Sequence, residues 1–419
     1  MKQQIINIIL LFIITFFIAQ NSSQAQSPPV LAFYYAWFDE TTWTSGKPAD
    51  MPLQPYRSAD SAIIEQHVSQ AKNAGINAFV QSWYGPNEGN QTETNFGMLL
   101  DISARYGFQA GVDFETYSPF FNGYDSVQTA LSTLMATHIH HPAYLRYNGK
   151  PVIFFWRQQR FSVWQWQQLR QTIDPNHATL WIAEGTDLSY QDIFDGHHLY
   201  SIAWTGNVHA ELGKWQPRIQ QIEARLGVDK LWIATVMPGY DDLHLYRADS
   251  FVRHRQDGEF YRQTWQAARA TNPDMIIITS FNEWLEGTQI EPSVMYGNTY
   301  LDLTRELVAM PIPTPNSQYV KASFDAPASF DAPNQQYTVQ AGDTIYALSV
   351  QFGISMNDIF IANNINENSI LHVGQILNIP TATITSIIDI DSMYPTAPTI
   401  SEMDEIFAGI TIMGQLPVE

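Results

Sequence analysis

The chain of 419 residues contains no cysteine and few basic residues. The absence of cysteine excludes disulfides, thiol catalysis and metal sites built on thiolates. Lysine and arginine total 21 against 41 aspartates and glutamates, which gives a formal net charge of −20. A charge of this sign argues against nucleic-acid binding, for which a basic face is expected. It is compatible with an extracellular protein that binds a neutral ligand such as a glycan.

The N-terminus has the features of a secretory signal peptide. Lys2 supplies a positive charge, Ile5–Ala19 is nearly all apolar, and Ser23-Gln24-Ala25 provides small residues for cleavage. We therefore expect residues 1–25 to be removed and the mature protein to be secreted. The alternative is an uncleaved anchor, for which the apolar stretch is short. No later segment is apolar enough to span a bilayer, so we expect no membrane contact after cleavage.

Short apolar runs alternate with amphipathic stretches from residue 30 to about residue 310. Eight strands are predicted, at Val30–Trp37, Ala78–Trp83, Gln109–Glu115, Pro151–Trp156, Thr179–Ala183, Leu199–Trp204, Leu231–Val236 and Met275–Ser280. Helical patterns separate most of them, at Ser61–Asn73, Phe96–Arg105, Ser126–His138, Val163–Thr172, Lys214–Leu226 and Glu259–Ala270. This alternation predicts an α/β protein with a parallel sheet, and eight units fit a (β/α)8 TIM barrel over residues 26–310. An open doubly wound sheet is the alternative, although no glycine-rich phosphate turn follows the first strand.

Polar and aromatic side chains are concentrated where the predicted strands end. In a (β/α)8 barrel the C-terminal ends of the strands form the face that carries the active site. The residues that we expect to bind substrate there are Tyr34, Tyr35, Trp37, Gln81, Trp83, Tyr84, Asp113, Glu115, Trp156, Arg157, Trp204, Tyr240 and Trp284. An aromatic residue at a strand end is more often a packing residue than a binding residue. The concentration of aromatic rings and carboxylates at one end, without a cysteine or a phosphate loop, nevertheless indicates glycoside chemistry.

Glu283 and Glu286 form the most informative pair in the chain. They follow the last predicted strand in the segment Asn282-Glu283-Trp284-Leu285-Glu286-Gly287-Thr288-Gln289-Ile290-Glu291-Pro292. No lysine or arginine lies within ten residues of either glutamate. Two carboxylates that are brought together in this way have pKa values that are pushed apart, which provides one acid and one base at the same pH. We therefore predict that Glu283 and Glu286 are the catalytic residues.

The segment that begins at Asn282 resembles the signature of glycoside hydrolase family 99, the endo-α-mannosidases and endo-α-mannanases. Weaker similarity extends over the barrel, through Phe33–Trp37 and His141–Val152. The resemblance implies a secreted, endo-acting, retaining α-glycosidase that uses no enzymic nucleophile, no metal and no cofactor. It implies that Glu283 acts as a base on the 2-hydroxyl of the sugar, so that a 1,2-anhydro sugar forms. Glu286 would protonate the departing oxygen and then activate the water that opens the ring.

One residue departs from the family pattern, because Leu285 lies where a histidine is expected in the mannosidases. An α-mannan is still the leading substrate. The alternatives are an α-1,3-glucanase-like hydrolase, a peptidoglycan-directed hydrolase, and a non-catalytic, wall-anchored glycan-binding protein. The presence of both glutamates argues against the last of these. A metal site at His138-Ile139-His140-His141 is a further alternative, but the spacing is crowded and a helix end is the simpler interpretation.

The region after the barrel begins with a linker and ends with an acidic tail. Residues 311–335 contain the segment Ala-Ser-Phe-Asp-Ala-Pro twice in succession, and proline and serine without a helical period indicate an extended spacer. Residues 381–419 contain no lysine or arginine and several aspartates and glutamates. We expect this tail to be disordered.

Residues 336–380, which lie between the linker and the tail, have a β-α-α-β pattern. The segment opens with Tyr337-Thr338-Val339 and closes with a Gly374-Gln375 turn into a last strand, with helical spacing at Ile345–Phe352 and Met356–Asn363 between the two. Over its whole length it resembles a LysM domain. The resemblance implies binding to a glycan that contains N-acetylglucosamine, such as peptidoglycan or chitin. The domain would hold the secreted enzyme at a cell wall.

Overall fold

The computed structural model describes residues 27–87, 89–310, 335–340, 348, 352, 359, 362–363, 365 and 371–379. They belong to two compact units, one within residues 1–316 and one within residues 317–411. The predicted signal peptide, most of the predicted linker and the acidic tail lie outside the described residues, so these boundaries stay predictions. No helix in the described part of the chain has the length and apolar character needed to cross a membrane.

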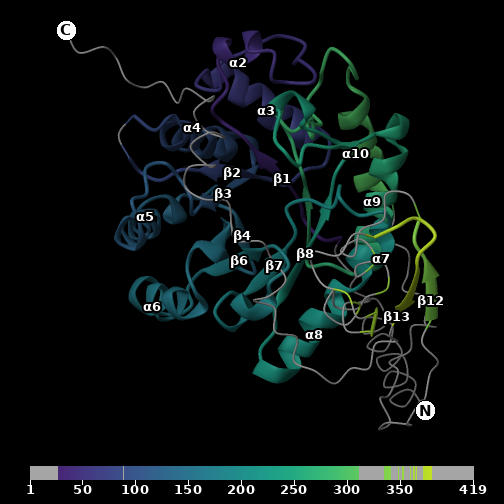
Figure 1. Ribbon diagram of the computed structural model, residues 1–419. Coiled ribbons are helices and arrows are strands. Elements are labelled where there is room, and N and C mark those ends of the chain that lie inside the picture. Colours follow the sequence, from purple (N-terminus) through teal and green to yellow (C-terminus); the bar gives the residue numbers. More distant parts are fainter. Residues whose placement is uncertain are drawn as a thin grey trace, which may run out of the picture. The chain divides into compact units, whose positions relative to one another are not determined.

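Eight parallel strands close into a barrel in the first unit (Figure 1). They are β1 (Val30–Tyr34), β2 (Ala78–Trp83), β3 (Gln109–Glu115), β5 (Lys150–Trp156), β6 (Leu180–Glu184), β7 (Gly196–His198), β8 (Leu231–Val236) and β11 (Met275–Ile278). Strand β11 pairs with β1, and β3 pairs with β5, so that the ring is complete. A short strand, β4 (Arg146–Tyr147), lies antiparallel to β5. The predicted (β/α)8 TIM barrel is confirmed.

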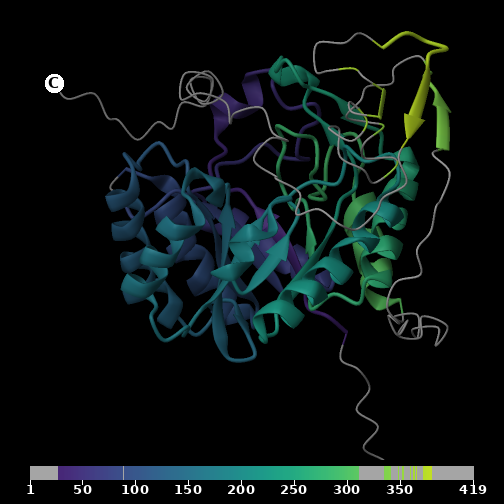
Figure 2. The same cartoon turned by 60° about the horizontal axis from the view of Figure 1, so that its bottom comes forward.

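Helices cover the outside of the barrel, and Figure 2 shows those of the blue part of the chain packed side by side. The longer ones are α3 (Ser61–Asn73), α4 (Gln91–Tyr106), α5 (Tyr124–Ala136), α6 (Val163–Ile173), α8 (Trp215–Leu226), α9 (Glu259–Ala270) and α10 (Thr299–Ala309). Helix α3 shows how local sequence sets these bounds: the Asp60 side chain accepts a hydrogen bond from the N–H of Ala62, and Gly75 follows the end with a φ of 87°. Helices α2 (Glu40–Thr44), α7 (Val208–Gly213) and α10 are additional to those expected.

The sixth barrel strand is not where the sequence pattern predicts it. The prediction of a strand over Leu199–Trp204 is wrong, because β7 is Gly196–His198 and the predicted residues follow it as a loop. A Cβ atom at Gly196 would lie 2.8 Å from both Ile182 Cδ1 and Leu231 Cβ on the neighbouring strands. Glycine therefore lets the three strands approach one another, but it is not a residue that predicts a strand.

The two histidines of β7 are a second reason why the sequence pattern does not predict this strand. His197 stacks on Trp215 outside the barrel, with ring centroids 5.1 Å apart, and His198 packs inside against Phe33 at 5.6 Å. Burial lowers the pKa of each histidine to about 3, so both are neutral and pack as aromatic rings. A pattern of polar and apolar residues does not identify them as core.

The second unit contains an antiparallel strand pair, β12 (Gln335–Thr338) and β13 (Ile376–Ile379). The two terminal strands of the predicted β-α-α-β pattern are therefore present. Most of its two helices lies outside the described residues, although Leu348 and Ile359 are helical and buried. The side-chain amide of Asn363 donates to Asn378 O at 2.9 Å and accepts from Asn378 N at 2.7 Å, which ties this helical residue to β13.

Candidate active site

The two glutamates lie in a loop after β11, residues 279–292, which we call the catalytic loop. It contains no helix or strand, so individual hydrogen bonds fix its path. Ser280 Oγ accepts from the N–H of Glu283 at 2.7 Å and lies 2.8 Å from Thr288 Oγ1. The N–H of Thr288 donates to the carbonyl of Glu283 at 3.2 Å. These bonds hold together the segments of the loop that precede and follow Glu283.

Asn282 joins the catalytic loop to the end of β1. Its Oδ1 accepts from the N–H of Tyr35 at 2.8 Å, and its Nδ2 donates to the carbonyl of the same residue at 2.9 Å. Both partners are buried, so a paired amide satisfies both backbone groups where β1 has ended. The register between Tyr35 and Glu283 is therefore fixed.

Glu286 is held by a tyrosine pair and an arginine. Tyr200 Oη donates to Glu286 Oε2 at 3.0 Å, and Tyr35 Oη lies 2.8 Å from Tyr200 Oη. Arg247 Nη1 lies 3.3 Å from Glu286 Oε1. No lysine or arginine lies within ten residues of either glutamate in the sequence, but the fold brings Arg247 next to Glu286. Arg247 comes from the segment between β9 (Tyr240–Asp241) and β10 (Val252–Arg253).

The environments of the two glutamates differ. Burial and the charge of Glu286 raise the pKa of Glu283 well above its ordinary value, against a smaller opposing effect of the Leu285 N–H, which donates to Glu283 Oε1 at 3.0 Å. Burial also raises the pKa of Glu286, but Arg247 and the Tyr200 hydroxyl oppose that rise. The protein alone therefore favours a proton on Glu283 and a negative charge on Glu286.

A second group of carboxylates lies close to the two glutamates. Burial raises the pKa of Glu115 to about 8, that of Glu184 to about 7, and that of Asp113 well above its usual range. The charge of Glu286 contributes to the shift of Glu115, and the charge of Glu115 contributes to that of Glu283, which places the two groups close together. Protonated carboxyls both donate and accept hydrogen bonds, as recognition of sugar hydroxyls requires.

Aromatic rings lie beside these carboxylates. Trp37 stacks on Tyr84 with centroids 5.5 Å apart and planes 17° apart, and it meets Tyr35 edge-on at 4.9 Å. Burial and the charge of Glu286 raise the pKa of Tyr240, which places this tyrosine near Glu286. The Arg157 guanidinium lies over the ring of Trp156, 4.9 Å from the ring centroid. Binding of substrate by these residues, and by Asp113 and Glu115, stays a prediction.

Four of the predicted binding residues have hydrogen-bond partners away from Glu283 and Glu286. Successive side chains of a strand point to opposite sides, and on β2 it is Ser82 that points inward and donates to Glu115. Its neighbours on β2 therefore point toward the helices, as does Tyr34 on β1. The hydrogen-bond partners of the four are the ring of His67 for Tyr34, the carbonyl of Thr92 for Gln81, Glu93 for Trp83, and Glu291 for Trp284.

Trp204 is also misplaced by the prediction. It lies in the loop after β7 rather than at a strand end, with 38% of its surface exposed. Its indole N–H donates to the carbonyl of Ser201 at 3.1 Å. The error follows from the wrong bounds of the sixth strand, which also hid Tyr200, two residues after β7.

The predicted alternative of a metal site on the histidine cluster has no support in the described residues, where no group of three or more ligands could hold a metal. His138 Nε2 lies 2.9 Å from Glu93 Oε1, and His141 Nε2 lies 3.4 Å from Asp101 Oδ1. These two histidines therefore lie against different carboxylates of α4.

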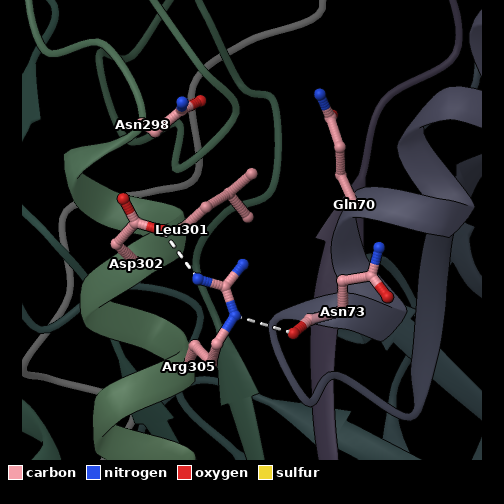
Figure 3. Close-up of a pocket in the computed structure, with 6 residues that line it drawn as sticks. All are labelled: Gln70, Asn73, Asn298, Leu301, Asp302 and Arg305. Atoms are coloured by element: carbon pink, nitrogen blue, oxygen red, sulfur yellow. Dashed lines mark hydrogen bonds and ion pairs between the residues drawn. The ribbon is translucent and has the colours of Figure 1, made fainter.

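A separate pocket of about 180 Å³ lies between α3 and α10 (Figure 3). Arg305 crosses its floor, with hydrogen bonds to Asp302 Oδ1 at 2.7 Å and to the carbonyl of Asn73 at 3.0 Å. None of the predicted catalytic or binding residues lines it. The lining residues are Gln70, Asn73, Asn298, Leu301, Asp302 and Arg305.

Comparison with known proteins agrees with this architecture. The chain is 28% identical over 290 residues to a glycoprotein endo-alpha-1,2-mannosidase-like protein of Mus musculus, and 27% identical over 293 residues to the glycoprotein endo-alpha-1,2-mannosidase of Xenopus laevis. These matches cover 60% and 61% of this chain and 63% of each relative, so the chain spans less than two thirds of their length.

A solved structure and two family models complete the comparison. The family 99 endo-alpha-mannosidase of Bacteroides thetaiotaomicron, in complex with Bis-Tris propane, has a TM-score of 0.58 and 26% identity, and covers 67% of this chain and 96% of that one. Residues 337–380 match the LysM domain. Residues 48–307 match the model of glycosyl hydrolase family 99. The chain therefore belongs to glycosyl hydrolase family 99 and carries a LysM domain after its barrel.

Proposed function

We propose that the protein is a secreted, endo-acting, retaining α-glycoside hydrolase that cleaves an α-mannan-type polysaccharide. The observation that carries this proposal is the pair of buried glutamates with different partners: Glu286 accepts hydrogen bonds from Tyr200 and Arg247, whereas Glu283 accepts one from the N–H of Leu285. Membership of the family supports the class of reaction. The names of the relatives support mannose as the sugar.

The proposed reaction has two steps. In the first, Glu283 takes the proton of the 2-hydroxyl, and that oxygen attacks the anomeric carbon while the bond to the leaving group breaks. Glu286 gives its proton to the departing oxygen, and a 1,2-anhydro sugar results. In the second, Glu286 takes a proton from water, the water oxygen opens the ring at the anomeric carbon, and Glu283 returns its proton to the 2-oxygen. Two inversions at one carbon give net retention.

This chemistry needs a proton on Glu286 and a charge on Glu283, which reverses the distribution in the protein alone. Substrate supplies the change. A 2-hydroxyl that donates to Glu283 favours its anion, whereas a glycosidic oxygen can only accept and so favours the protonated form of Glu286. The pair exchanges one proton between its members, so the net charge of the site is conserved.

We propose that the LysM domain binds peptidoglycan or chitin-type glycan and keeps the enzyme at a cell wall. The match over residues 337–380 supports this, and so does the small core of the described residues Val339, Leu348, Ile359, Leu377 and Ile379. Sedimentation of the Glu283→Gln protein with insoluble peptidoglycan or chitin tests it. Soluble N-acetylglucosamine oligomers should release the protein, and the absence of binding to both glycans would overturn the tether.

Hydrolysis is tested on α-mannan, α-1,3-glucan and peptidoglycan with the chain from residue 26 onward. We expect reducing sugar from α-mannan, with the α-anomer formed first, and no activity in Glu283→Gln or Glu286→Gln. Glu306→Gln is the matched control, because Glu306 is an exposed glutamate of α10 paired with Arg262. Full activity in either active-site variant would overturn the catalytic assignment, and activity on another glycan alone would overturn the substrate.

A further inference from the structure

A buried hydrogen-bond cluster lies behind the catalytic loop and centres on Glu291. Tyr56 Oη donates to Glu291 Oε2 at 2.9 Å, and Trp284 Nε1 donates to the same oxygen at 3.1 Å. His67 Nε2, from α3, lies 3.0 Å from Glu291 Oε1, and Tyr34 Oη lies 3.1 Å from His67 Nδ1. Glu291 is 6% exposed, and Trp284 and His67 are fully buried.

The cluster has one arrangement of hydrogens that satisfies all of its members. Tyr34 donates to His67 Nδ1, so His67 carries its proton on Nε2 and donates it to Glu291. The Glu291 carboxylate then accepts three hydrogen bonds, from His67, Tyr56 and Trp284. A buried carboxylate is costly unless it is satisfied in this way, and a complete network holds its members in one geometry.

We propose that Glu291 is a positioning residue, which aims the catalytic glutamates through Trp284 and Asn282. Trp284 directly follows Glu283 in a loop that has no regular structure, so fixing the indole fixes the backbone that carries Glu283. Asn282 Nδ2 lies 3.4 Å from Tyr56 Oη, and the same amide donates to the carbonyl of Tyr35. The Tyr35 hydroxyl in turn contacts the Tyr200 hydroxyl, which donates to Glu286.

The inference rests on the proposed function, and it explains the burial of Trp284 without a contact to sugar. Its test is Trp284→Phe, which keeps an aromatic ring and removes the N–H. The matched control is Trp232→Phe. Trp232 is 2% exposed, and its single indole hydrogen bond goes to Thr271 Oγ1 at 2.8 Å, on the outside of the barrel.

We expect kcat of Trp284→Phe to fall by about tenfold or more, since a misplacement of about 1 Å can cost about 100-fold. KM should change little, and both limbs of the pH profile should stay in place, because the acid and the base are unchanged. Trp232→Phe should lose a similar amount of thermal stability and keep kcat. Equal kcat in the two variants, or a displaced pH limb in Trp284→Phe, would overturn the proposal.

Two variants of Glu291 provide a second arm. In Glu291→Gln the amide can donate to His67 Nε2 once His67 moves its proton to Nδ1 and donates it to Tyr34 Oη, and the carbonyl still accepts from Tyr56 and Trp284. This variant should therefore retain most of kcat, whereas Glu291→Leu should lose as much as Trp284→Phe. Equal losses in both Glu291 variants would show that the charge acts rather than the hydrogen bonds, and would overturn the positioning role.

Amide hydrogen exchange separates failure of this inference from failure of the proposed function. Exchange over residues 282–286 should be faster in Trp284→Phe than in Trp232→Phe, whether or not the wild type hydrolyses the glycan that is tested. A wild type without hydrolase activity would overturn the proposed function. Unchanged exchange in Trp284→Phe would overturn the positioning role.

Discussion

Removal of the Arg247 charge should reveal which glutamate is the acid. The guanidinium of Arg247 lies 3.3 Å from Glu286 Oε1 and 3.6 Å from Asp242 Oδ2. It lowers the pKa of both Glu283 and Glu286, but of these two it hydrogen-bonds only to Glu286. Arg247→Met keeps most of the aliphatic stem and removes the charge. The pKa of Glu286 should therefore rise, and it should rise more than that of Glu283.

The size of this effect follows from the distance. Two unit charges 3.3 Å apart interact by about 1.3 kcal/mol even at the dielectric constant of bulk water. This lower bound is appropriate because 30% of the Arg247 side chain is exposed. Since about 1.4 kcal/mol is a factor of ten in a protonation equilibrium, Glu286 should titrate about one pH unit higher in the variant.

The assay is kcat against pH at saturating concentrations of the polysaccharide that the wild type cleaves, because kcat reports the pKa values of the enzyme–substrate complex, in which the proposal places the proton on Glu286. An acid must be protonated, so activity is lost as the pH rises through its pKa. If Glu286 is the acid, the basic limb moves upward by about one pH unit and the acidic limb moves less. Arg105→Met is the matched control, because Arg105 Nη2 lies 3.5 Å from Glu65 in an exposed pair. A larger movement of the acidic limb would assign Glu286 as the base, and two unmoved limbs would refute the electrostatic argument.

Three further predictions concern Glu115 and the barrel. Burial raises the pKa of Glu115 to about 8, so KM of the wild type should rise as the pH passes that value and a hydrogen-bond donor is lost; Glu115→Gln should remove this dependence. Gly196→Ala should cost about 1–3 kcal/mol in urea denaturation because its Cβ would meet two neighbouring strands, whereas Gly97→Ala, in open space within α4, should stabilise by about 0.5–1 kcal/mol. His198 is neutral in the folded protein, where its pKa is lowered to about 3. Its contribution to the free energy of unfolding is therefore complete above about pH 6.5, and it falls by up to about 1.4 kcal/mol for each pH unit below that value. The free energy of unfolding of the wild type should therefore fall more steeply than that of His198→Phe between pH 6.5 and 3; parallel curves would contradict the assignment.

Most of the barrel could be predicted because its signals are local. Seven of the eight strands begin within one residue of the predicted positions, since apolar runs of strand length separate amphipathic helices there. Strand β7 could not be predicted in this way. Its Gly-His-His sequence is suited to close strand approach and to neutral, stacked rings, and both depend on neighbours that lie far away in the sequence.

The site could be predicted in part, and its errors have two physical causes. Strands of a parallel barrel are buried on both faces, so alternation along β2 does not show that Ser82 points inward while Gln81 and Trp83 point outward. Arg247 reaches Glu286 from 39 residues away, through a segment whose position only the folded chain defines. Sequence reasoning could single out Glu283 and Glu286 because a local motif carries both, and their catalytic role stays a prediction.

The backbone and the side chain of Leu285 bear on different aspects of the proposed function, the reaction and the substrate. Its N–H donates to Glu283 Oε1, a bond that every residue except proline can make. The departure from the family pattern at this position therefore leaves the hydrogen bond to the proposed base intact. What changes is the side chain, which is apolar and 8% exposed. The geometry at Leu285 therefore leaves the proposed reaction intact and limits the consequence of the departure to substrate contacts.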